Sequence, residues 1–414
     1  MEIIRDPLWN NIAVDPLAMR LVDTPAFQRL RYVRQLGLAF LVYPGATHSR
    51  FEHALGTYHL ARRALALLEE RGALAGISRK ACTTIRIAAL LHDIGHYPFS
   101  HALEEIGALH HEEVARPLIT SGAVADALRE AIDDETPHEI MALIRGESLS
   151  PLQRLISGSL DLDKLDYLRR DAFMCGVPYG EIDVDRLLNS LTVVHGDDGA
   201  EIGIVEKGLS ALESLLFARY QMYRNVYWHH AVRSATAMYK RLVEDAVSAG
   251  SLNAATLAGF TDEGLLHDLA RRAPSPLLVA LRERRLFKRA FQCPAGDLPP
   301  DAAEWIADDR GVTRRVEDAL AAELGLNPGE LLLDYPTKTQ MLGLDIPLQR
   351  RNGDVSRLTA HGEGAINLPK LAEEFYRSAR WLRVFTCRPV RLQRDRVLDL
   401  VTRSREEVLR GRSG

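Results

Sequence analysis

Apolar residues recur three and four positions apart along most of the first 250 residues, with few alternating stretches of β-branched residues. This spacing is that of one buried face of an α-helix. It predicts helices over residues 24–35, 49–71, 79–93, 98–106, 111–120, 123–132, 136–144, 151–171, 183–190 and 208–249. Residues 191–206 differ, because SLTVVHG and AEIGIVEK flank the turn-forming Asp197-Asp198-Gly199, a pattern typical of a β-hairpin.

The pattern changes after about residue 250. Shorter helices are predicted near 262–272, 275–283 and 312–324. From about residue 329 the segments ELLLDYP, LDIPLQRR and WLRVFTCR have the short apolar runs of strands, around one helix at 369–379. We therefore predict a mainly α protein with two parts, a helical core over 1–249 and a smaller α+β portion over 250–414 that packs on the core.

Composition and charge narrow the class of protein. Of the 414 residues, 46% are hydrophobic and 26% are charged, as in folded globular proteins with ample core. The net charge of −4 argues against bulk electrostatic binding of nucleic acid, and the basic run RERRLFKRA at 282–290 is typical of a solvated helix face. Four cysteines without a CxxC pair favour a reducing compartment. With no signal peptide and no run of 18 apolar residues, we expect a cytoplasmic protein without membrane contact.

Histidine is concentrated in one part of the chain, since eight of the fourteen histidines lie between residues 48 and 111. His53 follows the apolar stripe of the predicted helix 49–71, and Asp163 follows that of helix 151–171. His92 and Asp93 come at the inward-facing end of helix 79–93. Taken singly, each residue is explained by a hydrogen bond or an ion pair in the core. Together, two imidazoles and two carboxylates are the donor set of a mononuclear transition-metal site with open coordination positions.

Four segments, in this order, carry a resemblance to a known family: YPGATHSRFEHALG (43–56), LLHDIGHYPFSH (90–101), HHEE (110–113) and LDLDKLDYLRRD (160–171). They resemble the HD-domain phosphohydrolases, and within that superfamily the dNTP triphosphohydrolases. The similarity extends from about residue 3 to 245, and a weaker similarity continues in the C-terminal portion. The resemblance implies an HD-domain helical catalytic core with a small β-hairpin and a smaller α+β C-terminal portion. We expect an enzyme of the SAM- and HD-domain type without the SAM domain.

The resemblance also implies a metal site and an acid/base layer beside it. The implied metal ligands are His53, His92, Asp93 and Asp163. The implied catalytic residues are His96, His101, Glu104 and His111. This ligand set suits one divalent transition metal, Mn, Fe, Zn, Ni or Co, with Mg weaker because its preferred ligands are harder.

The implied reaction releases a deoxynucleoside and intact inorganic triphosphate from a dNTP. Several fixed cations are needed around so highly charged a substrate. The implied substrate-binding residues are Gln35, Leu36, Arg50, Lys164, Tyr167, Asp171, Arg219, Tyr223 and Tyr227. Among them, Gln35 and Asp171 would bind the 3′ hydroxyl, while Tyr227 and Leu36 would leave no space for a 2′ hydroxyl. The alternative for the aromatic residues is a stripe packed in the core.

Some members of this family require a guanine nucleotide or a dNTP bound at a subunit interface. Asp23, Gln28 and Arg31 match the positions that contact that activator, whereas Glu2 and Arg5 depart from the pattern near its phosphates. An activator that bridges subunits couples regulation to homo-oligomerisation. An ordinary helix with exposed charges is the alternative.

Two other functions keep the same scaffold. An HD-type phosphatase would remove phosphates stepwise from a nucleotide, and a non-catalytic sensor would only hold one. The three cationic candidates Arg50, Lys164 and Arg219 favour a triphosphate substrate. A degenerate sensor should have lost ligands or catalytic histidines, and the sequence retains them all.

Overall fold

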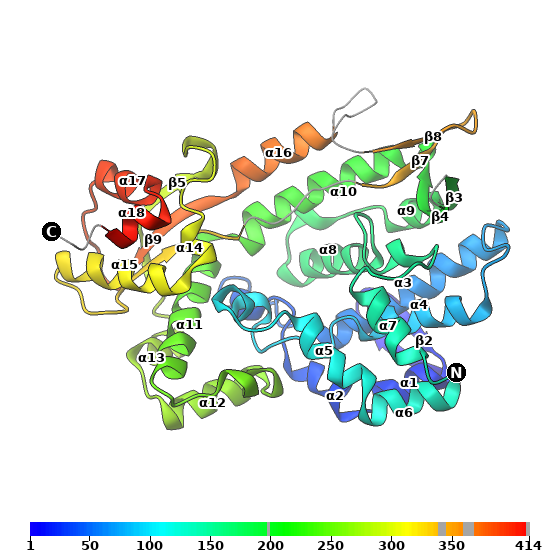
Figure 1. Cartoon of the computed structure of the whole chain (residues 1–414), viewed down its shortest axis with the longest axis horizontal. Helices are drawn as coiled ribbons and strands as arrows, with labels where there is room; N and C mark the ends of the chain where they lie inside the picture. The colour runs from blue at the N-terminus through cyan, green and yellow to red at the C-terminus, as the bar shows by residue number, and fades with distance from the viewer. Residues whose placement is uncertain (197–198, 338–344, 359–367, 411–414) are drawn as a thin grey trace.

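The computed structural model describes residues 1–196, 199–337, 345–358 and 368–410 (Figure 1). The chain is mainly helical with a few small sheets, which confirms the predicted fold class. The hairpin β1 (Glu2–Asp6) and β2 (Asn10–Val14) comes first. The helices of the N-terminal half are α1 (Pro16–Val22), α2 (Pro25–Gln28), α3 (Arg50–Glu70), α4 (Arg79–Leu91), α5 (His111–Thr120), α6 (Gly122–Ala131), α7 (Thr136–Ile144), α8 (Leu162–Cys175) and α9 (Val184–Ser190).

Helix α3 is the centre of this half, and it packs against both α4 and α8. Its start is fixed by a capping box, in which Glu52 accepts from the backbone and hydroxyl of Ser49. Helix α8 begins where Asp161 accepts from the backbone N–H of Lys164. Gly56 lets α8 approach, because a Cβ atom there would lie 1.9 Å from an oxygen of Asp166.

The second half continues with α10 (Leu209–Met222) and α11 (His230–Ser248). The remaining helices are α12 (Asp262–Arg272), α13 (Pro276–Arg282), α14 (Trp305–Asp308), α15 (Arg310–Glu323), α16 (Leu368–Ala379), α17 (Arg394–Thr402) and α18 (Arg405–Arg410). Figure 1 shows α14, α15, α17 and α18 gathered at the end of the molecule opposite the N-terminus. No helix in the described ranges is long and apolar enough to cross a membrane.

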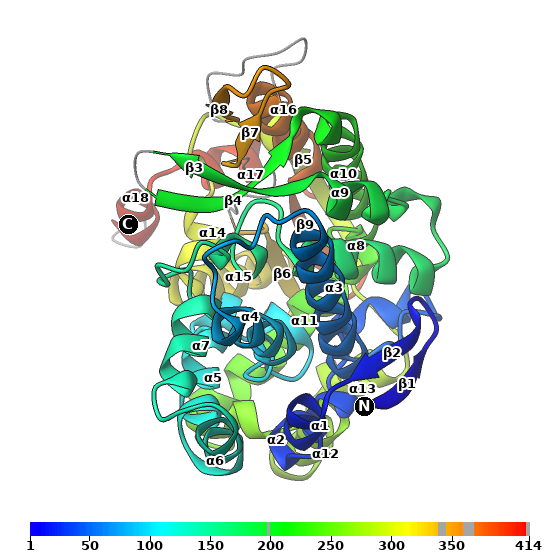
Figure 2. The same ribbon diagram turned by 90° about the vertical axis from the view of Figure 1, so that its right-hand side faces the viewer.

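Two sheets join parts of the chain that lie far apart in the sequence. The predicted hairpin is present as β3 (Leu191–Gly196) and β4 (Gly199–Val205), although its two aspartates, 197 and 198, lie outside the described residues. Strand β4 also pairs in parallel with β7 (Pro347–Gln349), which pairs with β8 (Val355–Arg357), and Figure 2 shows this sheet at the upper end of the molecule. A second sheet has the order β5-β9-β6, from β5 (Lys288–Pro294), β9 (Trp381–Thr386) and β6 (Leu331–Asp334).

The hydrophobic core also contains residues from both halves of the chain. Ile346 and Leu348 of the C-terminal portion belong to the core formed by α3, α4 and α8, whereas α15 packs with the β5-β9-β6 sheet in a cluster of its own. Helix α11 packs with α12 and α13 in a further cluster. The C-terminal portion therefore contributes to more than one core, and the boundary at residue 249 stays a prediction.

Several predicted helices were wrong in extent. Residues 98–106 form two 3₁₀ turns, Ser100–Ala102 and Glu104–Ile106, because Phe99 and Ser100 have φ angles of 58° and 67° that a helix does not permit. Residues 24–35 contain only α2 and a 3₁₀ turn, Arg29–Tyr32.

Two other long predictions were also wrong in continuity. Only the part of 151–171 from Leu162 onward is α-helical, because Asp161 caps a new helix there. The predicted helix 208–249 is divided between α10 and α11 by the π-helical turn Tyr223–Tyr227. Such π turns are frequent at functional sites.

Candidate functional site

One cavity of about 770 Å³ lies between α3, α5, α8 and the α10–α11 junction. All the predicted catalytic and substrate-binding side chains line it: Gln35, Leu36, Arg50, His96, His101, Glu104, His111, Lys164, Tyr167, Asp171, Arg219, Tyr223 and Tyr227. Of the predicted metal ligands, His92, Asp93 and Asp163 also line it, and His53 lies fully buried directly behind them. The structure thus brings together residues that are up to 192 positions apart between Gln35 and Tyr227.

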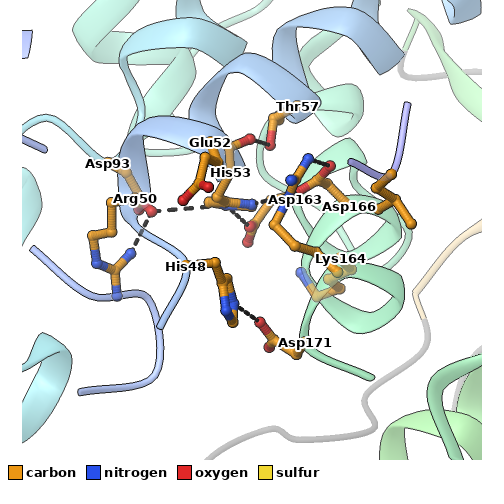
Figure 3. A network of polar contacts seen from close by, with 12 residues as sticks. His48, Arg50, Glu52, His53, Thr57, Asp93, Asp163, Lys164, Asp166 and Asp171 are labelled. Carbon is orange, nitrogen blue, oxygen red and sulfur yellow. Dashed lines mark hydrogen bonds and ion pairs between the residues drawn. The ribbon is translucent and has the colours of Figure 1, made fainter. Parts of the chain in front are cut away.

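The predicted metal ligands converge from three elements. His53 comes from α3, His92 and Asp93 from the end of α4, and Asp163 from the first turn of α8. His53 Nε2 lies 3.2 Å from His92 Nε2 and 2.9 Å from Asp163 Oδ1. Asp93 Oδ1 lies 3.5 Å from His92 Nε2. Figure 3 shows His53 between Asp93 and Asp163.

These separations fit a divalent metal ion. Two metal–nitrogen bonds of about 2.1 Å that meet at a right angle hold their donor atoms about 3 Å apart. Two imidazole nitrogens that could each accept a proton have little reason to approach within 3.2 Å unless a proton or a metal lies between them. His53, His92 and Asp93 form a group whose donor atoms lie within 4.8 Å of one another.

The charged side chains of this group shift one another's pKa values. Burial alone would lower the pKa of His53, but hydrogen bonds to Asp163 and Asp166 raise it to about 10. Burial alone would raise the pKa of Asp163, but hydrogen bonds from His53 and His92 hold it well below its usual range. The Arg50 guanidinium, which forms an ion pair with Asp93, likewise outweighs burial and keeps the pKa of Asp93 low. Both carboxylates are therefore anionic and ready to hold a cation.

A second cluster lies beside the first and contains the predicted acid/base residues. Glu104 Oε2 lies 3.1 Å from His101 Nδ1, and Glu104 Oε1 lies 2.8 Å from His111 Nδ1. The His96 and His111 rings are stacked with their centroids 3.9 Å apart. Burial would raise the pKa of Glu104, but the two imidazoles hold it well below its usual range. Glu104 is thus a carboxylate that orients two imidazoles toward the cavity, and the spacing of this cluster would also suit a metal ion.

A further part of the cavity lining comes from α8, the end of α10 and the π-helical turn. Asp171 Oδ2 accepts a hydrogen bond of 2.7 Å from the Tyr227 hydroxyl. Arg219 donates to the Tyr167 hydroxyl, and it is buried with its Nε atom unpaired among the described residues. Gln35 Oε1 is likewise buried and unpaired within the described part of the chain. Buried polar atoms without partners are costly, which favours a ligand that would pair with them.

Two of the predicted cations are already paired. Arg50 contacts Asp93 and the Ser100 hydroxyl, and Lys164 contacts Asp161 and the Gly158 carbonyl. A phosphate that binds either cation must compete with these partners. The aromatic residues of the π-helical turn also contact one another, with the Tyr223 and Tyr227 rings 5.1 Å apart.

The predicted activator residues lie outside the lining of this cavity. Asp23 is exposed at the end of α1, and Arg31 donates to Gln28 Oε1 at 2.7 Å. The Arg31 guanidinium lies 3.5 Å from the centroid of the buried Phe51 ring. Their role as an activator site stays a prediction.

Sequence reasoning did not predict two buried polar contacts at this site. His48 Nε2 lies 2.7 Å from Asp171 Oδ1, and both side chains are buried. Asp166 and Arg170 form a buried ion pair behind His53. The spacing of Asp166, one helical turn after Asp163, was a signal, because residues three apart share a helix face.

Two known protein families match parts of this chain. The HD domain family matches residues 50–171, and the HD-associated region matches residues 182–377. Residues 50–171 therefore form an HD domain that is followed by an HD-associated region, which confirms the resemblance seen in the sequence and supports hydrolase chemistry with a divalent metal.

Individual relatives include a deoxynucleoside triphosphate triphosphohydrolase. An uncharacterized protein of Methanocaldococcus jannaschii is 38% identical over 306 residues, which is 74% of this chain and 63% of that protein. The deoxynucleoside triphosphate triphosphohydrolase SAMHD1 of Bos taurus is 33% identical over 264 residues, 55% of this chain and 45% of that protein. The chain thus spans between about half and two thirds of the length of these curated relatives.

Solved structures with the same fold cover almost the whole chain. A phosphohydrolase from Bacteroides thetaiotaomicron has a TM-score of 0.74 at 25% identity, over 94% of this chain and 100% of that one. A hypothetical protein from Aquifex aeolicus has a TM-score of 0.71 at 26% identity, over 93% of this chain and 96% of that one. The C-terminal portion is therefore part of a shared architecture.

Proposed function

We propose that the protein is a metal-dependent dNTP triphosphohydrolase that releases a deoxynucleoside and inorganic triphosphate. One observation carries the proposal: a single cavity holds a His/Asp donor set, a histidine–carboxylate cluster beside it, and a wall of buried Arg, Tyr and Asp side chains. The similarity to the bovine triphosphohydrolase supports the choice of substrate.

In this proposal His53, His92, Asp93 and Asp163 hold one divalent metal, of which Mn, Fe, Zn, Ni or Co suit the ligands better than Mg. The metal would supply Lewis acidity toward a phosphate oxygen. Arg219 and Tyr167 would bind phosphate oxygens, since both side chains line the cavity that the donor set also lines. Arg50 and Lys164 would add charge once the substrate displaces their carboxylate partners.

The proton for the departing 5′ oxygen would come from His101. Glu104 accepts from Nδ1 of this imidazole, which leaves Nε2 to carry a proton toward the cavity. The carboxylate also stabilises the positive charge on the ring before transfer. His111 shares Glu104 and is a second candidate acid, and His96 stacks on His111.

Selection of the sugar would occur at the π-helical turn. Asp171 and Gln35 would bind the 3′ hydroxyl, because Gln35 has a buried oxygen free of partners among the described residues. Tyr227 is held by its hydrogen bond to Asp171. A fixed phenol at that place, with Leu36 beside it, would exclude a 2′ hydroxyl. The turn would thus make the enzyme prefer deoxynucleotides.

The test is to incubate the protein with Mn²⁺ and each dNTP, singly and in a mixture with GTP, and to resolve nucleosides and phosphates by ion-pair chromatography. Deoxynucleoside with intact triphosphate is the expected product. Orthophosphate or diphosphate would instead indicate stepwise removal. The incubation is repeated with Fe²⁺, Zn²⁺, Ni²⁺ and Co²⁺, and no turnover with any of the five metals would indicate a nucleotide sensor.

The matched variants are Asp93→Ala and Asp185→Ala. Asp93→Ala removes a proposed metal ligand and should lower kcat about 100- to 1,000-fold, the range seen when one group that stabilises a transition state is lost. Asp185 is an exposed carboxylate paired with Arg63 on the surface, so Asp185→Ala should keep full activity. Activity in Asp93→Ala equal to that of Asp185→Ala would refute the metal site.

A further inference from the structure

Behind the proposed metal ligands lies a second carboxylate that does not face the cavity. Asp166 is on α8, one turn after Asp163, and its side chain is completely buried. Its Oδ2 atom lies 2.8 Å from His53 Nδ1, whereas His53 Nε2 points to Asp163 and His92. A carboxylate can only accept, so Nδ1 carries a proton toward Asp166, and Nε2 is the ring nitrogen that would coordinate a metal at the donor set.

Asp166 has no capacity left to bind a metal itself. Its Oδ1 accepts from Trp9 Nε1 at 2.5 Å and from Arg170 Nη2 at 2.9 Å. Its Oδ2 accepts from Arg170 Nε at 2.8 Å in addition to His53. A carboxylate offers about four acceptor positions, and all of them are used. Asp163 differs, because its side chain is 31% exposed to the cavity. The two carboxylates of this helix turn therefore have different tasks.

The partners of Asp166 come from the N-terminal hairpin. Trp9 and Asp6 lie at the turn between β1 and β2. Asp6 Oδ2 accepts from Arg170 Nη1 at 2.8 Å, and Asp6 Oδ1 accepts from the Trp9 backbone N–H at 2.7 Å. Arg170 is thus held between two buried carboxylates. The hairpin, α8 and α3 are joined in one hydrogen-bonded chain that ends at His53.

The side chains around Asp166 form a buried polar network. Four charged or aromatic side chains are buried together, each at most 8% exposed: Asp6, Trp9, Asp166 and Arg170. Gly56 opens the space they fill, because a Cβ atom there would lie 1.9 Å from Asp166 Oδ1. Burying such a network stabilises a fold little compared with apolar packing, so its presence beside His53 points to a requirement for one fixed geometry.

We propose that Asp166 is a positioning residue for the metal site, and that the N-terminal hairpin holds it in place through Trp9, Asp6 and Arg170. The inference rests on the proposed metal site and deepens it. Asp166 fixes both the orientation and the tautomer of His53, as outer carboxylates do for metal-binding histidines. The hairpin thereby contributes to metal affinity although none of its residues lines the cavity.

The test measures metal affinity directly and uses two variants of the full chain. Asp166→Asn replaces an acceptor by a group that donates toward Arg170 or Trp9, and it should weaken binding of Mn²⁺ by about 10- to 100-fold. Trp9→Phe keeps the aromatic packing and removes one hydrogen bond, so a smaller loss is expected. Affinity is measured by isothermal titration of the chelator-stripped protein, and stoichiometry by elemental analysis.

A control separates positioning from general damage. Glu317 is a fully buried carboxylate paired with Arg241 and Arg310, outside the cavity lining. Glu317→Gln should destabilise the fold without changing the affinity for Mn²⁺. The visible spectrum of the Co²⁺-loaded protein should change in Trp9→Phe and stay unchanged in Glu317→Gln, because only the former alters a ligand's orientation.

The outcomes distinguish this inference from the proposed function. Folded Trp9→Phe and Asp166→Asn proteins with wild-type affinity and Co²⁺ spectra would overturn the positioning role alone. If Asp166→Asn does not fold, Trp9→Phe decides. A wild-type protein that binds no divalent metal would overturn the metal site and this inference together, whereas metal binding without dNTP hydrolysis would refute only the proposed reaction.

Discussion

The side chain of Asp171 is held from both sides, by His48 at 2.7 Å and by the Tyr227 hydroxyl at 2.7 Å. His48 is 2% exposed, and its Nδ1 atom has no partner among the described residues. The His48 imidazole thus orients the Asp171 carboxylate, which we propose binds the 3′ hydroxyl. Removal of that contact should disturb sugar recognition more than chemistry.

His48→Leu tests this role, because leucine fills much of the volume without donating a hydrogen bond. We expect kcat/KM for a dNTP to fall about tenfold, the value of one hydrogen bond to a charged group, with most of the effect in KM. The preference for a dNTP over its 2′,3′-dideoxy analogue should fall in parallel. His48→Gln, which can still donate, should recover part of the loss.

The control for this prediction is His195→Leu, at an exposed histidine on β3. It should leave both kinetic constants unchanged. An unchanged preference for the 3′ hydroxyl in a folded His48→Leu protein would contradict the proposed contact between Asp171 and the sugar.

At the scale of elements, periodicity located most helices but not their interruptions. The helical spacing of apolar residues continues through 208–249, so nothing in it marked the π-helical turn at which the Tyr223 and Tyr227 side chains enter the cavity. The pattern over 98–106 likewise missed two residues with positive φ, because a backbone angle set by tertiary contacts leaves no periodic signal. The predicted metal and acid/base residues of the four motifs meet at one cavity, whereas partners such as Trp9 became visible only in the folded chain.

The loop at Phe99 is held by a carboxylate on another element. Asp262, at the start of α12, accepts from the backbone N–H of Phe99 at 2.8 Å and from that of Arg34 at 3.0 Å. Burial outweighs these hydrogen bonds and the nearby Arg34 guanidinium and raises the pKa of Asp262 to about 6. The carboxyl group is therefore more easily protonated in the folded chain than in the unfolded one.

This raised pKa predicts a pH dependence of stability. Between about pH 4 and pH 6 the folded chain binds a proton at Asp262 that the unfolded chain releases, so the contribution of Asp262 to the free energy of unfolding falls as pH rises through that window. It is level above pH 6. Relative to Asp262→Asn, the wild type should lose up to about 3 kcal/mol between pH 4 and pH 7, measured by urea denaturation. Parallel profiles for the two proteins would contradict this assignment.

At the scale of the whole molecule, the predicted activator residue Arg31 packs against α3, and none of the predicted activator residues lines the cavity. Arg31 packs on the ring of Phe51, and Phe51 follows Arg50, which contacts Asp93. A ligand that repositions Arg31 therefore has a short packed route to the proposed metal site. Asp23 and Arg31 are exposed, so a nucleotide or a second copy of the chain can reach them.

If a guanine nucleotide or a dNTP binds there between subunits, assembly and activity should rise together, because a ligand that binds only the oligomer stabilises it. We expect GTP with a dNTP mixture to shift the protein to a larger species in sedimentation velocity and to raise the hydrolysis rate, by about 5- to 150-fold for a typical coupling free energy. Arg31→Ala should abolish both effects. Arg20→Ala, at an exposed arginine of α1 paired with Glu130, should retain both. Full activity of an unassembled wild-type protein on single dNTPs would show that the site around Arg31 is not an activator site.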